Sequence, residues 1–132
     1  MLISIGGIIL DISVCIITNN EADKLEKCLL SLKKYNLEIV VVDTGSTDNT
    51  SVIIDKYADI SGSYKWCDDF SKARNYSISL AGNDWILVLD SDEWIENMNI
   101  NEVAAIISNQ SVNCTGKIEL INNINYDNEL TR

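Results

Sequence analysis

The sequence contains no proline and no histidine, and it has half as many basic as acidic residues. Without proline, internal repeats or a low-complexity linker, nothing divides the 132 residues into parts, so we predict one domain over residues 1–132. Without histidine, and with no Cys-x-x-Cys pair among the 4 cysteines, a zinc or iron–sulfur site is not expected. Any metal in this protein should therefore be held by oxygen ligands.

The charge balance is strongly acidic. The chain carries 10 Lys and Arg against 20 Asp and Glu, for a formal net charge of −10. Proteins that bind nucleic acids or anionic membranes non-specifically bring Lys and Arg to phosphate groups. We therefore expect no nucleic-acid partner. An anionic nucleotide would need a bound cation or a local Arg to offset the field of the protein.

The chain also lacks a long hydrophobic run. Residues 1–10 are apolar but carry no Lys or Arg, and Asp11 interrupts them well before the ~20 residues that a membrane helix needs. We interpret this segment as an additional edge strand or a leader. Cys15 and Cys28 lie in apolar patterns typical of core residues, which indicates reduced thiols. The expected location is cytoplasmic, with attachment to the inner face of the membrane as an option.

Apolar runs alternate with amphipathic segments along the chain. ISVCIIT is a continuous run typical of a strand buried on both faces, and the segment after it repeats apolar residues at helical spacing. We predict strands at Ile12–Thr18, Ile39–Val42, Ser63–Trp66, Trp85–Leu89 and Lys117–Ile121, and helices from Asn20 to Leu32, from Asp48 to Tyr57, at Phe70–Leu80 (with Phe70, Ala73, Ser77 and Ile78 inward) and around Asn101–Ile107. This alternation predicts an α/β fold with a mostly parallel, doubly wound sheet and flanking helices. Because the last strand looks internal to a sheet, we expect the domain to continue beyond Arg132.

Polar side chains follow the ends of the strongest strands. Thr18–Glu21 follows the first strand, Asp43 follows the second, and Asp90–Asp92 follows Trp85–Leu89. In open α/β sheets, ligands bind beyond the carboxyl ends of the strands, so the sequence predicts a ligand site there. The tryptophans are interpreted as core or rim residues and are not assigned to this site: Trp66, Trp85 and Trp94.

Asp90 and Asp92 are separated by one residue, so an extended backbone would turn both carboxylates to the same side. Such oxygen ligands suit Mg²⁺ or Mn²⁺, with diphosphate oxygens completing the coordination. A D-x-D pair alone is a weak signal, because a solvated acidic turn has the same sequence. Its place directly after an apolar strand favours the metal, whereas Glu93 is expected to point elsewhere.

Two further residues have both a structural and a functional interpretation. Asp43 could cap the turn at Gly45–Ser46, or it could accept the imide N–H of a uracil. Arg74 could pair with Asp68 or Asp69, or it could contact the base or diphosphate of a nucleotide, because a guanidinium suits both groups. The residues alone leave these alternatives open.

The segments ISVCIITNNEADKLEKCLLSL, EIVVVDTGSTDNT, WCDDFSKARNYSIS and NDWILVLDSDEWI resemble the family 2 nucleotide-diphospho-sugar glycosyltransferases of the GT-A type, from about Ile12 to Ile95. The motifs stand in the family's order and at its spacing, which makes the match specific. The D-T-G-S-T-D and W-x-D-D-F-x-x-A-R-N signatures are similar to those of bacterial members. The resemblance implies that residues 1–132 form the N-terminal, nucleotide-sugar-binding part of such a domain, without its acceptor half.

The resemblance implies roles for residues on the nucleoside side of the site. Asp43 corresponds to the acidic residue that reads the uracil of a UDP-sugar. Thr18, Asn20 and Glu21 correspond to the loop that borders the nucleoside. Asn19 stands where many members carry an aromatic residue that stacks on the base, so this stacking contact is not expected from residue 19.

The resemblance also implies roles on the diphosphate side. Arg74 corresponds to the basic residue of the A-R-N segment near the donor. Asp90, Ser91 and Asp92 correspond to the motif that binds the diphosphate and the metal, with Asp90 and Asp92 as metal residues and Asp92 preferred as the direct ligand. The catalytic base of inverting members lies in the second half of the domain, beyond Arg132, so no residue of this chain is assigned as the base.

These residues together imply a glycosyltransferase that binds a UDP-sugar with Mn²⁺ or Mg²⁺ and transfers the sugar, with inversion, to an unknown glycan, lipid or peptide. This chain alone is expected to transfer little sugar. A non-catalytic nucleotide-sugar-binding fragment is one alternative. A nucleotidyltransferase is another, but it would carry a Gly-rich basic loop where this chain has TNNEAD. An exposed sheet edge would also permit a homodimer.

Overall fold

The computed structural model describes residues 2–5, 8–99, 102–103, 122–123 and 130–131. Its elements are β1 (Leu2–Ile5), β2 (Ile8–Thr18), α1 (Ala22–Leu32), the 3-10 helix η1 (Lys33–Tyr35), β3 (Glu38–Asp43), α2 (Thr50–Tyr57), β4 (Ile60–Ser63), α3 (Phe70–Leu80), β5 (Trp85–Val88), β6 (Asn122–Asn123) and β7 (Leu130–Thr131). The predicted strand Lys117–Ile121 lies outside the described residues, as does most of the predicted helix Asn101–Ile107.

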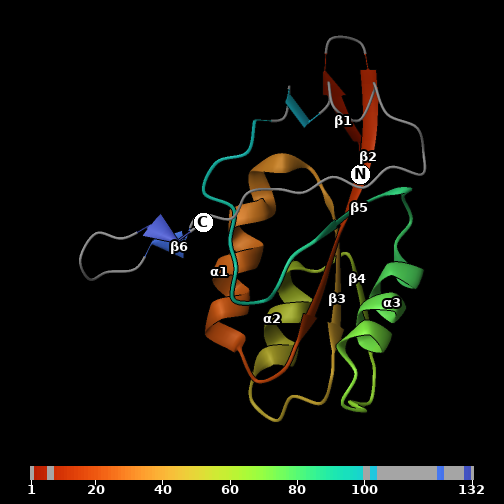
Figure 1. Ribbon diagram of the computed structural model, residues 1–132, viewed down its shortest axis with the longest axis vertical. Coiled ribbons are helices and arrows are strands. Elements are labelled where there is room, and N and C mark those ends of the chain that lie inside the picture. Colours follow the sequence, from red (N-terminus) through yellow and green to blue (C-terminus); the bar gives the residue numbers. More distant parts are fainter. Residues whose placement is uncertain (1, 6–7, 100–101, 104–121, 124–129, 132) are drawn as a thin grey trace.

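A parallel sheet in the order β5-β2-β3-β4 forms the centre of the molecule (Figure 1). The long strand β2 pairs with β3 up to Thr18↔Asp43 and with β5 up to Cys15↔Val88. Strand β1 pairs with the first part of β2 in the antiparallel direction. The additional strand expected within residues 1–10 is therefore present, and the mostly parallel α/β fold is confirmed.

The helices cover both faces of this sheet. Helices α1 and α2 pack against each other over one face, and α3 contacts β2 and β3 on the other (Figure 1). The apolar stripe predicted for α1 is buried as Ala22, Leu25, Cys28, Leu29 and Leu32. Burial on both faces explains why β2 reads as a continuous apolar run rather than an alternating one. No helix within the described residues is long and apolar enough to span a membrane.

Two helices begin later than predicted, because polar side chains at their starts make other bonds. Asn20 adopts a left-handed backbone, with φ of 51°, and its Oδ1 accepts the N–H groups of Thr47 and Asp48 at 2.7 and 3.2 Å. Helix α1 therefore begins at Ala22. Asp48 precedes α2 rather than opening it, and its Oδ1 accepts the N–H of Thr50 at 3.0 Å.

The prediction for the strand before α3 was wrong in its position. Strand β4 occupies Ile60–Ser63 instead of Ser63–Trp66, because the pairing partner β3 ends at the register position Asp43↔Ser63. The chain leaves the sheet there. Helix α3 has the predicted bounds, and Ala73 and Ser77 are buried as predicted, but Phe70 is 65% exposed instead of inward.

Two buried thiols set an alkaline limit to the stability of this fold. Burial raises the pKa of Cys15 to about 11 and that of Cys28 to about 12, from an ordinary value of 9.0. The folded protein thus retains thiol protons that the unfolded chain releases. The contribution of these protonated thiols to the free energy of unfolding should be fully present below pH 9 and should be lost as the pH rises through about 11.

Denaturant titrations below pH 9 and near pH 11 would measure this loss. A Cys15→Ala, Cys28→Ala double variant is the matched control, because it keeps every Lys and Tyr that also titrates in that range. Its free energy of unfolding should depend less on pH than that of the parent protein. Equal pH dependence in the two proteins would contradict the assignment.

Candidate functional site

The carboxyl ends of the parallel strands bring the predicted polar residues to one edge of the sheet. Thr18 and Asp43 are register partners at the ends of β2 and β3. Asp90 follows β5, whose last residue Val88 pairs with Cys15 of β2. The residues predicted from separate strand ends are therefore neighbours in the fold, as a parallel sheet requires.

Asp43 caps the turn that follows β3. Its Oδ1 accepts the N–H groups of Gly45 and Ser46 at 3.2 and 2.9 Å, and the Ser46 hydroxyl at 2.7 Å. Gly45 has a φ of 119°, which side chains rarely adopt, so the turn needs glycine there. The turn-capping interpretation of Asp43 is confirmed. The Oδ2 atom makes no hydrogen bond with a described residue, so the same carboxylate still offers one acceptor to a ligand.

Asn20 joins the loop after β2 to the loop after β3. Besides the bonds to its Oδ1, its N–H donates to the Ser46 hydroxyl at 2.8 Å. An open cavity of about 270 Å³ lies beside this junction, lined by residues 20–24 together with Asp48 and Asn49. Residue 20 thus holds the Asp43 turn against the first loop.

Thr18 supports the site through its backbone. The residue is 3% exposed, and its carbonyl oxygen accepts the N–H and the hydroxyl of Thr44 at 3.0 and 3.1 Å. Its Oγ1 is buried and has no hydrogen-bond partner among the described residues. The side chain that the resemblance places at the nucleoside is therefore enclosed by protein.

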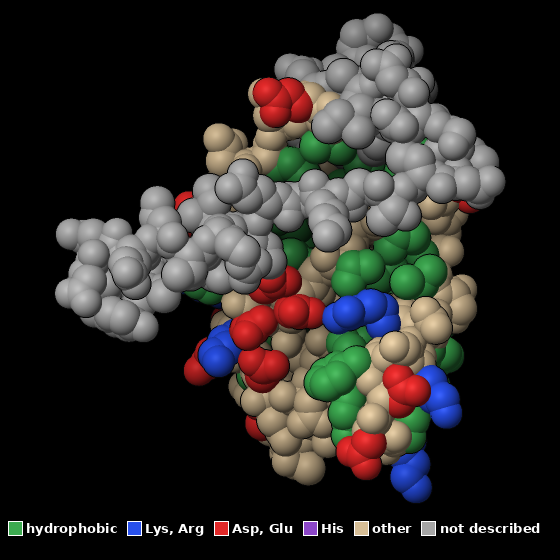
Figure 2. Space-filling model, in the orientation of Figure 1, with side chains coloured by type: hydrophobic (Ala, Val, Ile, Leu, Met, Phe, Trp, Pro, Cys, Tyr) green, Lys and Arg blue, Asp and Glu red, His purple; other side chains and the backbone are tan. Residues whose placement is uncertain are grey.

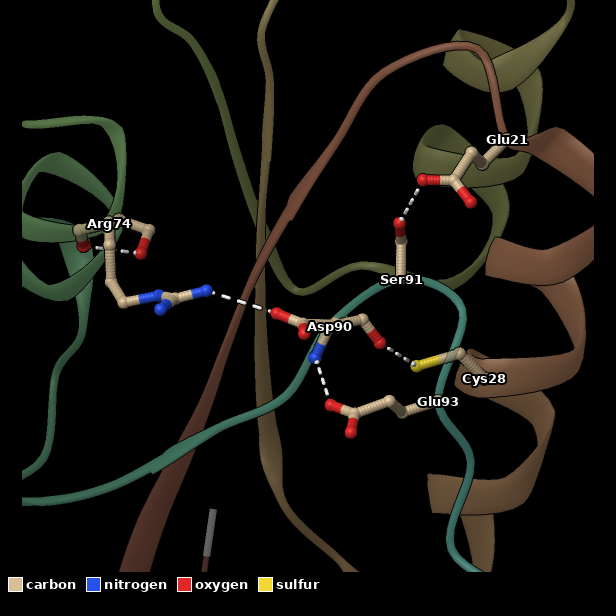
Figure 3. Close-up of polar contacts among 7 residues, drawn as sticks. Glu21, Cys28, Arg74, Asp90, Ser91 and Glu93 are labelled. Atoms are coloured by element: carbon tan, nitrogen blue, oxygen red, sulfur yellow. Dashed lines mark hydrogen bonds and ion pairs between the residues drawn. The ribbon is translucent and has the colours of Figure 1, made fainter. Parts of the chain in front are cut away.

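The segment after β5 forms a tight turn, so the expected extended backbone at Asp90–Asp92 is wrong. The N–H of Glu93 donates to the carbonyl of Asp90 at 3.0 Å. Glu93 Oε1 accepts the N–H of Asp90 at 2.8 Å (Figure 3). The Leu89 N–H still donates to the carbonyl of Cys15 on β2 at 3.2 Å, and the backbone turns away from β2 after this bond. The Glu93 carboxylate bonds to the backbone of Asp90 and closes the turn. Asp92 is exposed, and its carboxylate makes no hydrogen bond within the described part of the chain.

Arg74 reaches across the sheet to this turn. Its Nη2 lies 3.0 Å from Asp90 Oδ1, with the two side chains 36% and 57% exposed (Figure 3). The predicted partners are engaged elsewhere, because Asp69 caps α3 and Asp68 accepts the indole N–H of Trp66. An ion pair this exposed stabilises the fold by only about 0–1 kcal/mol. Arg74 can therefore exchange Asp90 for an anionic ligand at little cost.

Helix α1 holds the Asp90–Glu93 turn in place. The Ser91 hydroxyl donates to Glu21 Oε1 at 3.0 Å, and the Cys28 thiol donates to the Asp90 carbonyl at 3.9 Å (Figure 3). Glu21 thus links the loop after β2 to the turn after β5. Sequence reasoning missed this use of Cys28, since its apolar spacing on α1 indicated only a core residue.

The surface of this region combines both signs of charge. Acidic side chains gather beside a basic one in the middle of the face, with hydrophobic side chains adjoining them (Figure 2). The described residues contain no group of three or more His, Cys, Asp and Glu that could hold a metal alone. Asp90 and Asp92 are exposed, so they could contribute to holding a Mg²⁺ or Mn²⁺ ion only if other ligands, such as diphosphate oxygens and water, completed its coordination.

Comparisons with known proteins show the family of this chain. The family model for glycosyl transferase family 2 matches residues 13–132. Glycosyltransferase SunS of Bacillus subtilis, described as SPbeta prophage-derived, is 39% identical over 104 residues, which are 75% of this chain. The match covers 25% of that relative, so the chain spans about a quarter of its length.

Two solved structures share this fold. TarS 1–349 of S. aureus has a TM-score of 0.66 and 27% identity, over 83% of this chain and 39% of that one. Glucosyl-3-phosphoglycerate synthase of Mycobacterium tuberculosis, solved with Mn²⁺, UDP and glucosyl-3-phosphoglycerate, has a TM-score of 0.54 and 22% identity, over 61% of this chain and 33% of that one. This chain belongs to glycosyl transferase family 2 and has the Rossmann-like GT-A fold of those enzymes.

Proposed function

We propose that this chain is the donor-binding part of a glycosyltransferase that uses a UDP-sugar together with Mn²⁺ or Mg²⁺. The observation that carries the proposal is the Arg74–Asp90 ion pair beside the exposed Asp92. It places a guanidinium and two carboxylates at the end of β5, in a protein whose net charge of −10 would otherwise repel a diphosphate. A UDP and Mn²⁺ complex of the synthase with this fold supports the choice of ligands.

The residues divide the work of binding the leaving group. Asp90 and Asp92 would hold the metal, which supplies positive charge to the departing diphosphate. Arg74 would move from Asp90 toward the phosphate oxygens, for which its planar fork of donors is suited. Asp43 would offer Oδ2 to the imide N–H of uracil while Oδ1 keeps the turn closed. For the whole protein, we expect transfer of the sugar with inversion to an acceptor that is a glycan, a lipid or a peptide.

Calorimetric titration of UDP in Mn²⁺ and in EDTA tests the proposal. We expect UDP to bind at least about tenfold more tightly with Mn²⁺, because the ion offsets repulsion between the diphosphate and the carboxylates of Asp90 and Asp92. Uridine, which has no phosphate, is the control and should show no such difference. Equal affinity for UDP in Mn²⁺ and in EDTA would refute the metal assignment, and no binding of UDP under either condition would refute the donor assignment.

A further inference from the structure

Two aromatic side chains at the start of α3 are exposed: Trp66 in the preceding loop and Phe70, the first residue of the helix. Phe70 is 65% exposed and Trp66 is 36% exposed, and their rings meet edge to face with centroids 4.7 Å apart. The indole N–H of Trp66 donates to Asp68 Oδ1 at 3.0 Å, which fixes the orientation of the ring. Large aromatic side chains left in water forgo the burial that usually stabilises them, so an ordered, exposed pair indicates a contact surface.

The pair lies in the segment that connects the Asp43 side of the site to Arg74. The N–H of Tyr64 donates to the backbone carbonyl of Asp43 at 2.9 Å, so the segment that carries Trp66 begins beside Asp43. Phe70 stands one helical turn before Arg74 on α3, which puts both side chains on the same side of that helix. The segment that carries both rings therefore begins beside the carboxylate proposed to read the base and ends one helical turn before the guanidinium proposed to meet the diphosphate.

The loop after β2 offers no comparable surface to a flat ligand. Asn19 and Asn20 are both amides, and each is committed to neighbouring loops: Asn19 Nδ2 donates to Thr44 Oγ1 at 3.2 Å, and Asn20 Oδ1 accepts from the turn after β3. A nucleobase bound at Asp43 would find its apolar contact on the α3 side of the site instead.

We infer that the Trp66–Phe70 pair is the stacking surface for the nucleobase of the donor. The inference rests on the proposed function, which supplies the nucleotide. Stacking on an aromatic ring is available to every base, because each has a π face. Asp43 would then select among bases by hydrogen bonding, whereas Trp66 and Phe70 would contribute affinity without selectivity.

Binding of UDP and of inorganic pyrophosphate, both with Mn²⁺, separates stacking from diphosphate binding. Phe70→Ala and Trp66→Ala should each lower the affinity for UDP about tenfold. The affinity for pyrophosphate should stay unchanged, since pyrophosphate has no base. Phe70→Tyr should retain the affinity of the parent protein. Leu30→Ala removes another exposed apolar side chain, 48% exposed on α1, and should change neither affinity.

Tryptophan fluorescence provides a second readout. UDP should quench the emission of the parent protein, and Trp66→Phe should lose that quenching while keeping most of the affinity. Unchanged UDP affinity in Phe70→Ala and Trp66→Ala would overturn the inference and leave the proposed function standing. Equal losses for UDP and pyrophosphate would also overturn it, because the rings would then act through Arg74 or the metal. Failure of the parent protein to bind UDP would instead refute the proposed function itself.

Discussion

Replacing Asp92 by Asn is expected to weaken Mn²⁺-dependent UDP binding about 100-fold, the largest single effect at this site. Loss of groups that merely orient metal ligands reduces metal affinity by ~10–100-fold, and loss of a direct ligand should reach the upper end. Asp92 is exposed and hydrogen-bonds to no described residue, so the substitution should leave stability nearly unchanged. Calorimetry with UDP and Mn²⁺, together with thermal unfolding, measures both quantities.

Asp84→Asn is the matched control for this prediction. Asp84 is also exposed, but it precedes β5 and therefore lies at the opposite end of the strand. The same change of charge there should alter UDP affinity little. A similar loss of UDP affinity in both variants would show that the net charge of the protein sets the affinity, and not a metal-binding carboxylate in the Asp90–Glu93 turn. Parent-like affinity in Asp92→Asn would remove Asp92 from the metal site.

Asp43→Asn is expected to weaken UDP binding by about 1–3 kcal/mol while the protein stays as stable as the parent. The geometry allows this separation because the bonds that close the turn all end on Oδ1. An amide can keep its single oxygen in that place and put its NH₂ group where Oδ2 stood. The NH₂ group cannot accept the imide N–H of uracil. Calorimetry and thermal unfolding of the same variant give the two values.

Asp43→Ala and Ser46→Ala complete this comparison. Asp43→Ala should lose both affinity and stability, because it removes the turn cap and the acceptor together. Ser46→Ala removes the hydroxyl that bonds to Asp43 and to Asn20, so it should lower stability with a smaller effect on UDP. If Asp43→Asn lowers stability and leaves UDP affinity unchanged, Asp43 is a structural cap only.

Several features of this chain follow from local pattern. Helix α3 has the predicted bounds, because an acidic N-cap residue precedes it and its buried positions recur at helical spacing. The runs around β2, β3 and β5 are apolar and bounded by polar residues, which indicates buried strands. The approach of Asp43 and Asp90 to one edge also follows, because parallel strands end on the same side of their sheet.

Two predictions failed because a residue's partner lies far away in the sequence. Strand β4 ends at Ser63 because β3 ends opposite it. The sequence of residues 63–66 does not indicate where the pairing partner ends. Asn20 looks like a helix cap, but its oxygen is taken by Thr47 and Asp48 on another loop. A side chain with several possible partners takes the one that the fold brings near.

The amino-acid sequence by itself determined the α/β plan, the family and the residues at the strand ends, because periodicity and motif spacing are local properties of the chain. Only the tertiary structure decided how those residues are used. It paired Arg74 with Asp90 instead of Asp68 or Asp69, and it left Phe70 in solvent beside the site. Those outcomes depend on the packing of α3 against β2 and β3, and contacts between distant segments form only when the whole domain folds.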